Sequence, residues 1–131
     1  MRVVFDTNIF VSAVALPRGQ AEQALLRVVA GKDLLIVSKP IIDELLTVLA
    51  RKFSRDREEL ARLAFFISEL GEVVYPELKI GELEDEADNR VLECAIAGGA
   101  EAIVTGDHAM LKLGKYENVS IITLRDYLSS T

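Results

Sequence analysis

The chain has 131 residues, of which 50% are apolar and 27% charged, and its formal net charge is −6. This composition is that of one globular domain, and the excess of acids argues against a strongly basic surface for binding nucleic acid. The single cysteine, Cys94, excludes an intramolecular disulfide and a cysteine-based zinc site, and no apolar run approaches the ~20 residues that span a bilayer. We therefore expect one cytoplasmic domain over residues 1–131, without membrane association.

Short β-branched apolar runs alternate along the chain with segments of helical period. The runs predict strands at 3–5, 34–37, 73–75, 102–104 and 119–122. Helices are predicted at 20–30, 39–52, 56–70, 89–97, 108–113 and 124–128. Ser38 is a candidate N-cap for the second helix, and Asp56 and Glu59 have the spacing of a capping box at the start of the third.

The strands are continuously apolar rather than alternating, which indicates burial on both faces. Strands that alternate with helices indicate a parallel sheet with helices on each side. The sequence therefore predicts an α/β fold, a three-layer α/β/α sandwich around a central parallel sheet.

Acids follow two of the predicted strands. Asp6 comes directly after the strand at 3–5, and Asp107 follows the strand at 102–104. Asp88 lies at the start of the helix that leads into the second of these strands. Ligands of open α/β sheets bind outside the carboxyl ends of the strands, so the three acids are expected to meet at one edge.

A fourth acid is selected by its position on the helix at 39–52. At about 100° per residue, Glu44 falls at the margin of the apolar arc, beside Val48. Asp43 points well away from that arc. Glu44 is thus expected at the border of core and cleft, and Asp43 in solvent.

Each acid also has a purely structural interpretation. Asp6 and Asp107 are suited to loops or N-caps after strands, and Asp88 is well placed to cap the helix at 89–97. Glu44 has the position of an ordinary solvated residue beside an apolar stripe. The argument for a functional site therefore depends on the convergence of the four acids.

Converging carboxylates repel one another, which raises their pKa values or attracts cations. Ligand sets made only of oxygen select hard ions such as Mg²⁺ or Mn²⁺. Two such ions can activate water and stabilise both oxygens of a phosphodiester displacement. The acid set is thus suited to metal-dependent phosphodiester hydrolysis.

Three stretches resemble the motifs of PIN domains, a family that includes the VapC-type ribonuclease toxins of prokaryotic toxin–antitoxin pairs. The stretch "VVFDTNIFVSA" resembles the first motif and "SKPIIDELLTVLARKF" the second. The stretch "EDEADNRVLECAIAGGAEAIVTGDHAML" resembles the third and fourth. The resemblance runs in order through almost the whole chain and implies a PIN-like, Rossmann-like topology.

The resemblance implies that Asp6, Glu44, Asp88 and Asp107 are catalytic and ligate Mg²⁺ or Mn²⁺. Supporting roles are implied for Thr7, Asn8, Ser12, Asp85 and Thr105. The implied reaction is hydrolysis of RNA, single-stranded or structured, to a 5′-phosphate and a 3′-hydroxyl. A cognate antitoxin and a homodimer are the implied partners. The resemblance also implies an acid two residues after the fourth-motif Asp, where this chain has Ala109, a departure that affects the second metal site.

Other features have a structural and a functional interpretation. The basic residues Arg51, Lys52, Arg55 and Arg57 could be solvated surface, or could bind RNA phosphates or an acidic partner. Phe65 and Phe66 could form a dimer or antitoxin contact, or belong to a helix buried on two sides. Cys94 is expected in the core.

The leading hypothesis is a metal-dependent endoribonuclease, probed by replacing its acids. One alternative is a PIN-like nucleic-acid-binding module with weak metal sites, favoured by Ala109. The other is an aspartate-based phosphotransfer domain with Asp6 as nucleophile, but Asn8 stands where haloacid-dehalogenase-type phosphatases have a second Asp.

Overall fold

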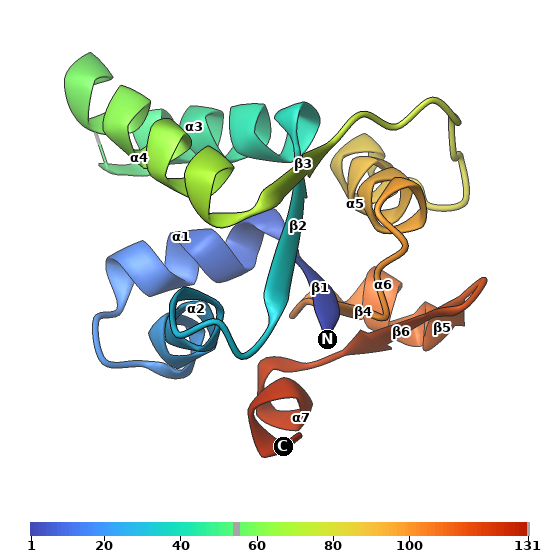
Figure 1. Cartoon of the computed structure of the whole chain (residues 1–131). Coiled ribbons are helices and arrows are strands. Elements are labelled where there is room, and N and C mark those ends of the chain that lie inside the picture. Colours follow the sequence, from blue (N-terminus) through green and yellow to red (C-terminus); the bar gives the residue numbers. More distant parts are fainter. Residues whose placement is uncertain (54–55, 131) are drawn as a thin grey trace.

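A computed structural model describes residues 1–53 and 56–130. Its strands form one sheet in the order β3-β2-β1-β4-β6-β5 (Figure 1). Neighbouring strands are parallel except β5 and β6, which are antiparallel. The strands are β1 (Arg2–Phe5), β2 (Leu34–Ser38), β3 (Glu72–Val74), β4 (Ala102–Val104), β5 (Lys115–Tyr116) and β6 (Val119–Ile122). The predicted parallel sheet is confirmed, with a short antiparallel edge strand that the prediction lacked.

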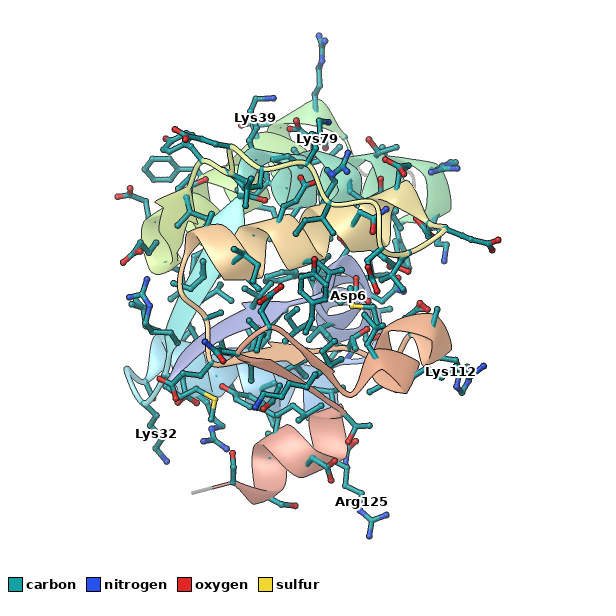
Figure 2. The ribbon with its side chains drawn as sticks, turned by 90° about the vertical axis from the view of Figure 1, so that its right-hand side faces the viewer. Asp6, Lys32, Lys39, Lys79, Lys112 and Arg125 are labelled. Carbon is teal, nitrogen blue, oxygen red and sulfur yellow. The ribbon has the colours of Figure 1, made fainter. Side chains whose placement is uncertain are left out.

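Helices cover both faces of this sheet. Helix α5 lies along one face, while α2 and α7 lie on the other, as Figures 1 and 2 both show. Helices α3 and α4 form an antiparallel pair beside β2 and β3. The helices are α1 (Thr7–Ala15), α2 (Gln20–Val29), α3 (Lys39–Phe53), α4 (Arg57–Leu70), α5 (Glu86–Ala97), α6 (His108–Leu113) and α7 (Leu124–Ser129). The three-layer α/β/α arrangement is confirmed.

Helix α1 is an addition to the predicted elements. Its apolar residues are nearly continuous, with Ile9, Phe10 and Val11 all buried. A run of this kind has no clear helical period and includes β-branched residues that favour strands. The run is helical because it packs against α2 and α3, a tertiary effect.

The two predicted N-caps have different outcomes. Asp56 caps α4 as expected, because its carboxylate accepts a hydrogen bond from the Glu59 backbone N–H at 2.8 Å. The prediction for Ser38 was wrong. Ser38 is the last residue of β2, and its buried hydroxyl has no hydrogen-bond partner among the described residues.

The core consists of the sheet and the inward faces of the helices. Strand β1 is central, and the residues Val3, Val4 and Phe5 are at most 1% exposed. Among the described residues, no helix is long and apolar enough to cross a membrane.

The strand order reverses beside β1. The chain adds β2 and then β3 on one side of β1, and returns to place β4 on the other side. The carboxyl ends of β1 and β4 therefore flank the topological switch point, where open α/β sheets bind their ligands.

Candidate active site

Asp6 and Thr105 meet at the switch point. Asp6 follows β1 and is 5% exposed, and the fully buried Thr105 follows β4. The Thr105 hydroxyl donates a hydrogen bond to Asp6 Oδ2 at 2.7 Å and accepts one from the Asp107 backbone N–H at 3.0 Å. Figure 2 shows Asp6 inside the molecule, on the side where α6 lies. Thr105 thus connects the first and the last acid of the predicted set.

Asp88 enters the same site from the first turn of α5. Its side chain is buried, and burial together with the charges of Asp107, Asp6 and Asp85 raises its pKa to about 7. A hydrogen bond with the Asp107 carboxyl group further favours its protonated form. The three acids predicted to meet at one edge therefore interact with one another.

Asp6 is subject to opposing influences. Burial raises its pKa, and the Asp107 charge acts in the same direction, while the Thr105 hydroxyl lowers it. The net shift is upward. Two buried acids on neighbouring elements are thus held in an environment that disfavours negative charge.

The capping alternatives are now resolved acid by acid. Asp85, not Asp88, caps α5 by accepting a hydrogen bond from the Ala87 backbone N–H at 2.8 Å. The helix begins three residues earlier than predicted, so the interpretation of Asp88 as an N-cap was wrong. Asp107 does cap α6, with its carboxylate 3.3 Å from the Ala109 backbone nitrogen. Asp6 occupies the N-cap position of α1 but makes no capping bond.

Glu44 is placed on α3, a helix that packs against both α1 and α5. It is half-buried, while Asp43 is exposed and pairs with Lys39 at 2.7 Å. The expected contrast between these two acids is confirmed. Glu44 remains a predicted member of the site, supplied from α3 rather than from the carboxyl ends of β1 and β4.

The supporting residues of the first motif lie on α1. Thr7 is buried, Asn8 is exposed, and Ser12 is half-buried one turn after Asn8. Asn8 and Ser12 therefore share a face of the helix.

The three acids fit a divalent cation in their chemistry but not in their spacing. Over residues 1–53 and 56–130, no three acid, histidine or cysteine side chains are grouped closely enough to hold an ion as they stand. The chemistry of the donors nevertheless fits a hard cation, because Asp6, Asp88 and Asp107 offer only oxygen and repel one another. A cation would relieve this repulsion.

A cavity of about 670 Å³ opens beside Asp88 and Asp107. Its volume is in the range of small-molecule sites. Lys112, on α6, is the one cationic side chain among the described lining residues, and Ala109 also lines the cavity. The lining residues are Glu82, Leu83, Glu84, Asp85, Asp88, Asp107, Ala109, Lys112 and Leu113.

Asn89 is a structural part of the site that sequence reasoning missed. It is fully buried on α5, and its amide accepts a hydrogen bond from the Leu83 backbone N–H at 2.9 Å and donates one to the Leu83 carbonyl at 2.8 Å. Glu93 acts similarly by accepting a bond from the Ile80 backbone N–H at 2.9 Å. Both fix the loop that forms one wall of the cavity. The sequence signal for this role was the position of Asn89, an amide directly after Asp88 in a helix with an apolar face.

The remaining predicted features lie outside this cluster. Arg51 and Lys52 are exposed at the end of α3 and Arg57 at the start of α4, while Arg55 lies outside the described residues. Cys94 is in the core as predicted, and burial raises the pKa of its thiol to about 12.

Helix α4 exposes two aromatic side chains. Phe65 is 68% exposed and Phe66 44%, whereas Ile67 on the inward face is 1% exposed. The interpretation of this segment as a helix buried on two sides was therefore wrong. The alternative, a dimer or antitoxin contact, stays a prediction.

The sequence of the chain matches a known protein family. A family model described as a PIN domain matches residues 2–109. The chain belongs to the PIN-domain family. This PIN domain is similar to an uncharacterized protein of Methanocaldococcus jannaschii, with 26% identity over 95% of the chain and 84% of the relative.

Two solved structures share the fold of this PIN domain. One is VapBC2 from Rickettsia felis bound to a DNA fragment from its promoter, with a TM-score of 0.64 and 18% identity. The alignment covers 94% of this chain and 98% of the other. The second is VapBC-1 from nontypeable Haemophilus influenzae, with a TM-score of 0.64, 16% identity, and 95% and 99% coverage.

Proposed function

We propose that this PIN domain is a metal-dependent endoribonuclease and the toxin component of a toxin–antitoxin pair. The observation that carries the proposal is the burial of Asp6 and Asp88 at the switch point of the sheet beside Asp107, where burial and the neighbouring acids raise the Asp88 pKa to about 7. Buried carboxylates that lie close together and repel one another are typical of metal sites. Membership of the PIN-domain family supports the assignment to nucleases.

In this proposal Asp6, Glu44, Asp88 and Asp107 hold Mg²⁺ or Mn²⁺. A bound divalent ion would supply Lewis acidity to a phosphodiester and lower the pKa of water. Thr105 holds the Asp6 carboxylate in one orientation. Glu44 would supply the fourth of these carboxylates, from α3.

The supporting residues have lesser roles. Asp85 adds negative charge beside Asp88, and Thr7, Asn8 and Ser12 would position acids or substrate from α1.

RNA is the proposed substrate, cleaved to leave a 5′-phosphate and a 3′-hydroxyl. Arg51, Lys52, Arg55 and Arg57 are proposed phosphate contacts, because the net charge of −6 requires a local basic surface for RNA. The similar structures from Rickettsia felis and Haemophilus influenzae are VapBC assemblies, which supports a cognate antitoxin as partner. A homodimer is also proposed.

The test is cleavage of a mixed single-stranded RNA by the purified protein in Mn²⁺, in Mg²⁺ and in EDTA. We expect cleavage only with metal, and a loss of at least ~100-fold in Asp6→Asn. The matched control is Asp43→Asn, an exposed acid on α3 that should keep full activity. Equal cleavage by Asp6→Asn and the parent protein would refute the site.

The second candidate function is an RNA-binding module without turnover. One observation favours it: the described acids are not grouped tightly enough for an ion. The resemblance also implies an acid at the position of Ala109, which this chain lacks. RNA binding that persists in EDTA, with no cleavage under Mn²⁺, would select this candidate.

A further inference from the structure

The cavity beside Asp88 and Asp107 is lined by the loop before α5 and by helix α6. The loop contributes the exposed acids Glu82 and Glu84, whereas α6 contributes the exposed cation Lys112. Among the described residues that line this cavity, five are acids and one is a cation. An anion that enters the cavity is therefore repelled by the loop and attracted only by α6.

The Lys112 side chain is not used by the fold. It forms no ion pair or hydrogen bond within the part of the chain that the structure describes. Helix α3, by contrast, pairs Lys39 with the acid one turn later, Asp43, at 2.7 Å. The residues one turn before Lys112 are His108 and Ala109, so α6 offers no such acid. The charge of Lys112 is thus available to a molecule in the cavity.

The position of Lys112 on α6 places its side chain on the side of the acids. Helix α6 begins directly after Asp107, and Lys112 lies one turn after its first residue. Side chains of a helix lean toward its N-terminus, which for α6 is the end at Asp107. Figure 2 shows Lys112 and Asp6 toward the same side of the molecule, and Lys32 on the opposite side.

An ammonium group on a flexible stem is suited to a phosphate. Lysine offers a compact charge and three donors without the fixed geometry of arginine, so it can follow a mobile phosphate backbone. The described basic residues proposed above as phosphate contacts do not line this cavity, which leaves Lys112 as its source of positive charge.

We propose that Lys112 binds a backbone phosphate of the RNA beside the scissile bond and holds the strand against α6, away from the acids of the loop. This inference rests on the proposed function and adds a substrate-binding residue to the same site.

The experiment measures binding of a labelled single-stranded RNA by fluorescence anisotropy in EDTA, over a series of salt concentrations. Each phosphate contact to a single strand contributes about 0.7 to the slope of the logarithm of affinity against the logarithm of salt. Lys112→Met should therefore reduce this slope by about 0.7 and raise the dissociation constant roughly 5-fold at low salt. Lys112→Arg keeps the charge and should bind as the parent protein does. Lys32→Met, exposed on the opposite side, is the matched control for net charge and should change neither quantity.

Neutralising the loop should have the reverse effect. Glu84→Gln removes an exposed acid of the cavity and should lower the dissociation constant roughly 2-fold. In Mn²⁺, Lys112→Met should raise KM for cleavage roughly 5-fold and leave kcat within about 2-fold, because the phosphate contact is made equally in the ground state and the transition state.

An unchanged salt slope in Lys112→Met would overturn the proposal. An equal loss of binding in Lys32→Met would also overturn it, because net charge alone would then explain the effect, and so would Lys112→Arg binding as weakly as Lys112→Met. Cleavage with an unchanged KM in Lys112→Met would refute this inference and leave the nuclease standing. Binding that depends on Lys112, without cleavage in Mn²⁺, would support this inference and refute the nuclease, whereas a parent protein that does not bind RNA would overturn both.

Discussion

Buried acids at the two ends of the parallel strands have pKa values shifted in opposite directions. We call the end where the strands finish the carboxyl edge and the end where they begin the amino edge. At the carboxyl edge, the charge of Asp107 acts on both Asp6 and Asp88, and burial together with this charge raises the pKa values of both. At the amino edge, Asp33 precedes β2 and is 8% exposed. Burial alone would raise its pKa as well, but its partners outweigh burial and hold the pKa below the ordinary value.

Those partners come from α2, from α7 and from Met1, just before β1. The Tyr127 hydroxyl donates a hydrogen bond to Asp33 Oδ2 at 2.6 Å, and the Met1 amino group lies 3.0 Å from Oδ1. Arg27 lies 3.3 Å from Oδ2, with its guanidinium 4.6 Å from the centre of the Tyr127 ring. Arg27 also donates hydrogen bonds to the Tyr127 and Ser130 carbonyls. Asp33 thereby ties α2 and α7 to the start of β2.

The comparison shows that burial alone does not identify a functional acid. Asp33, Asp6 and Asp88 are all less than 9% exposed. The difference is the sign of the surrounding charge. Asp33 has cationic partners and stabilises the fold, whereas Asp6 and Asp88 lie beside other acids and are suited to bind a cation.

The largest effect is expected from removing the partnered acid. Asp33→Asn should lower the free energy of unfolding by about 2 kcal/mol, because Arg27 loses its charge partner in a largely buried position. Urea denaturation measures the change. Asp43→Asn, which breaks an exposed pair with Lys39, should cost less than ~0.5 kcal/mol. Equal losses in the two variants would mean that Asp33 is no more than another surface ion pair.

The two edges should also respond oppositely to pH. The lowered pKa of Asp33 contributes stability that is present above its ordinary value of 3.8 and lost as the pH falls through the folded-state value. The raised pKa of Asp88 contributes stability below 3.8 that is lost as the pH rises toward about 7.

In EDTA, the parent protein should therefore lose at least about 1 kcal/mol between pH 4 and pH 7 relative to Asp88→Asn. Thermal melts of both proteins across this range measure the difference. Parallel curves would contradict the coupling of Asp88 to its neighbouring acids.

Most elements could be predicted because their signals are local. Buried strands are runs such as Leu35, Ile36 and Val37, and α4 begins after Asp56, whose N-cap hydrogen bond forms as expected. Helix α1 could not be predicted, because only its packing against α2 and α3 makes a nearly continuous apolar run helical. The two-residue strand β5 exists only through its pairing with β6.

The arrangement of the site was harder to predict from the sequence than the fold was. The end-of-strand rule placed Asp6 and Asp107 at one edge, but their link through Thr105 depends on β1 and β4 being neighbours, a non-local fact. Five acids lie within 82–88, and the sequence could not show that Asp85 caps α5 while Asp88 is buried. The position of Glu44 relative to these acids depends on how α3 packs against α1 and α5, which no local pattern encodes.

The smallest effect, and the most specific to the carboxyl edge, is expected from Thr105. Thr105→Val keeps the shape of the side chain but removes the donor to Asp6 and the acceptor for the Asp107 backbone N–H. We expect about 1 kcal/mol of lost stability and roughly 10-fold slower cleavage, with a weaker apparent affinity for Mn²⁺.

If Thr105 acts by positioning Asp6, a substitution that retains the hydroxyl should restore the cleavage and Mn²⁺ affinity that Thr105→Val removes. Thr105→Ser retains the hydroxyl and should restore cleavage and Mn²⁺ affinity, although it removes a buried methyl group and costs stability of its own. The two variants therefore separate orientation of Asp6 from packing: stability falls in both, while metal affinity falls only in Thr105→Val. If Mn²⁺ affinity falls equally in both variants, the methyl group rather than the hydroxyl is what matters at this position. The Asp6 carboxylate would then be oriented by the packing of β1 against β4 rather than by the Thr105 hydroxyl. The two edges would differ in the charge that surrounds their buried acids, but not in the hydrogen bonds that orient them.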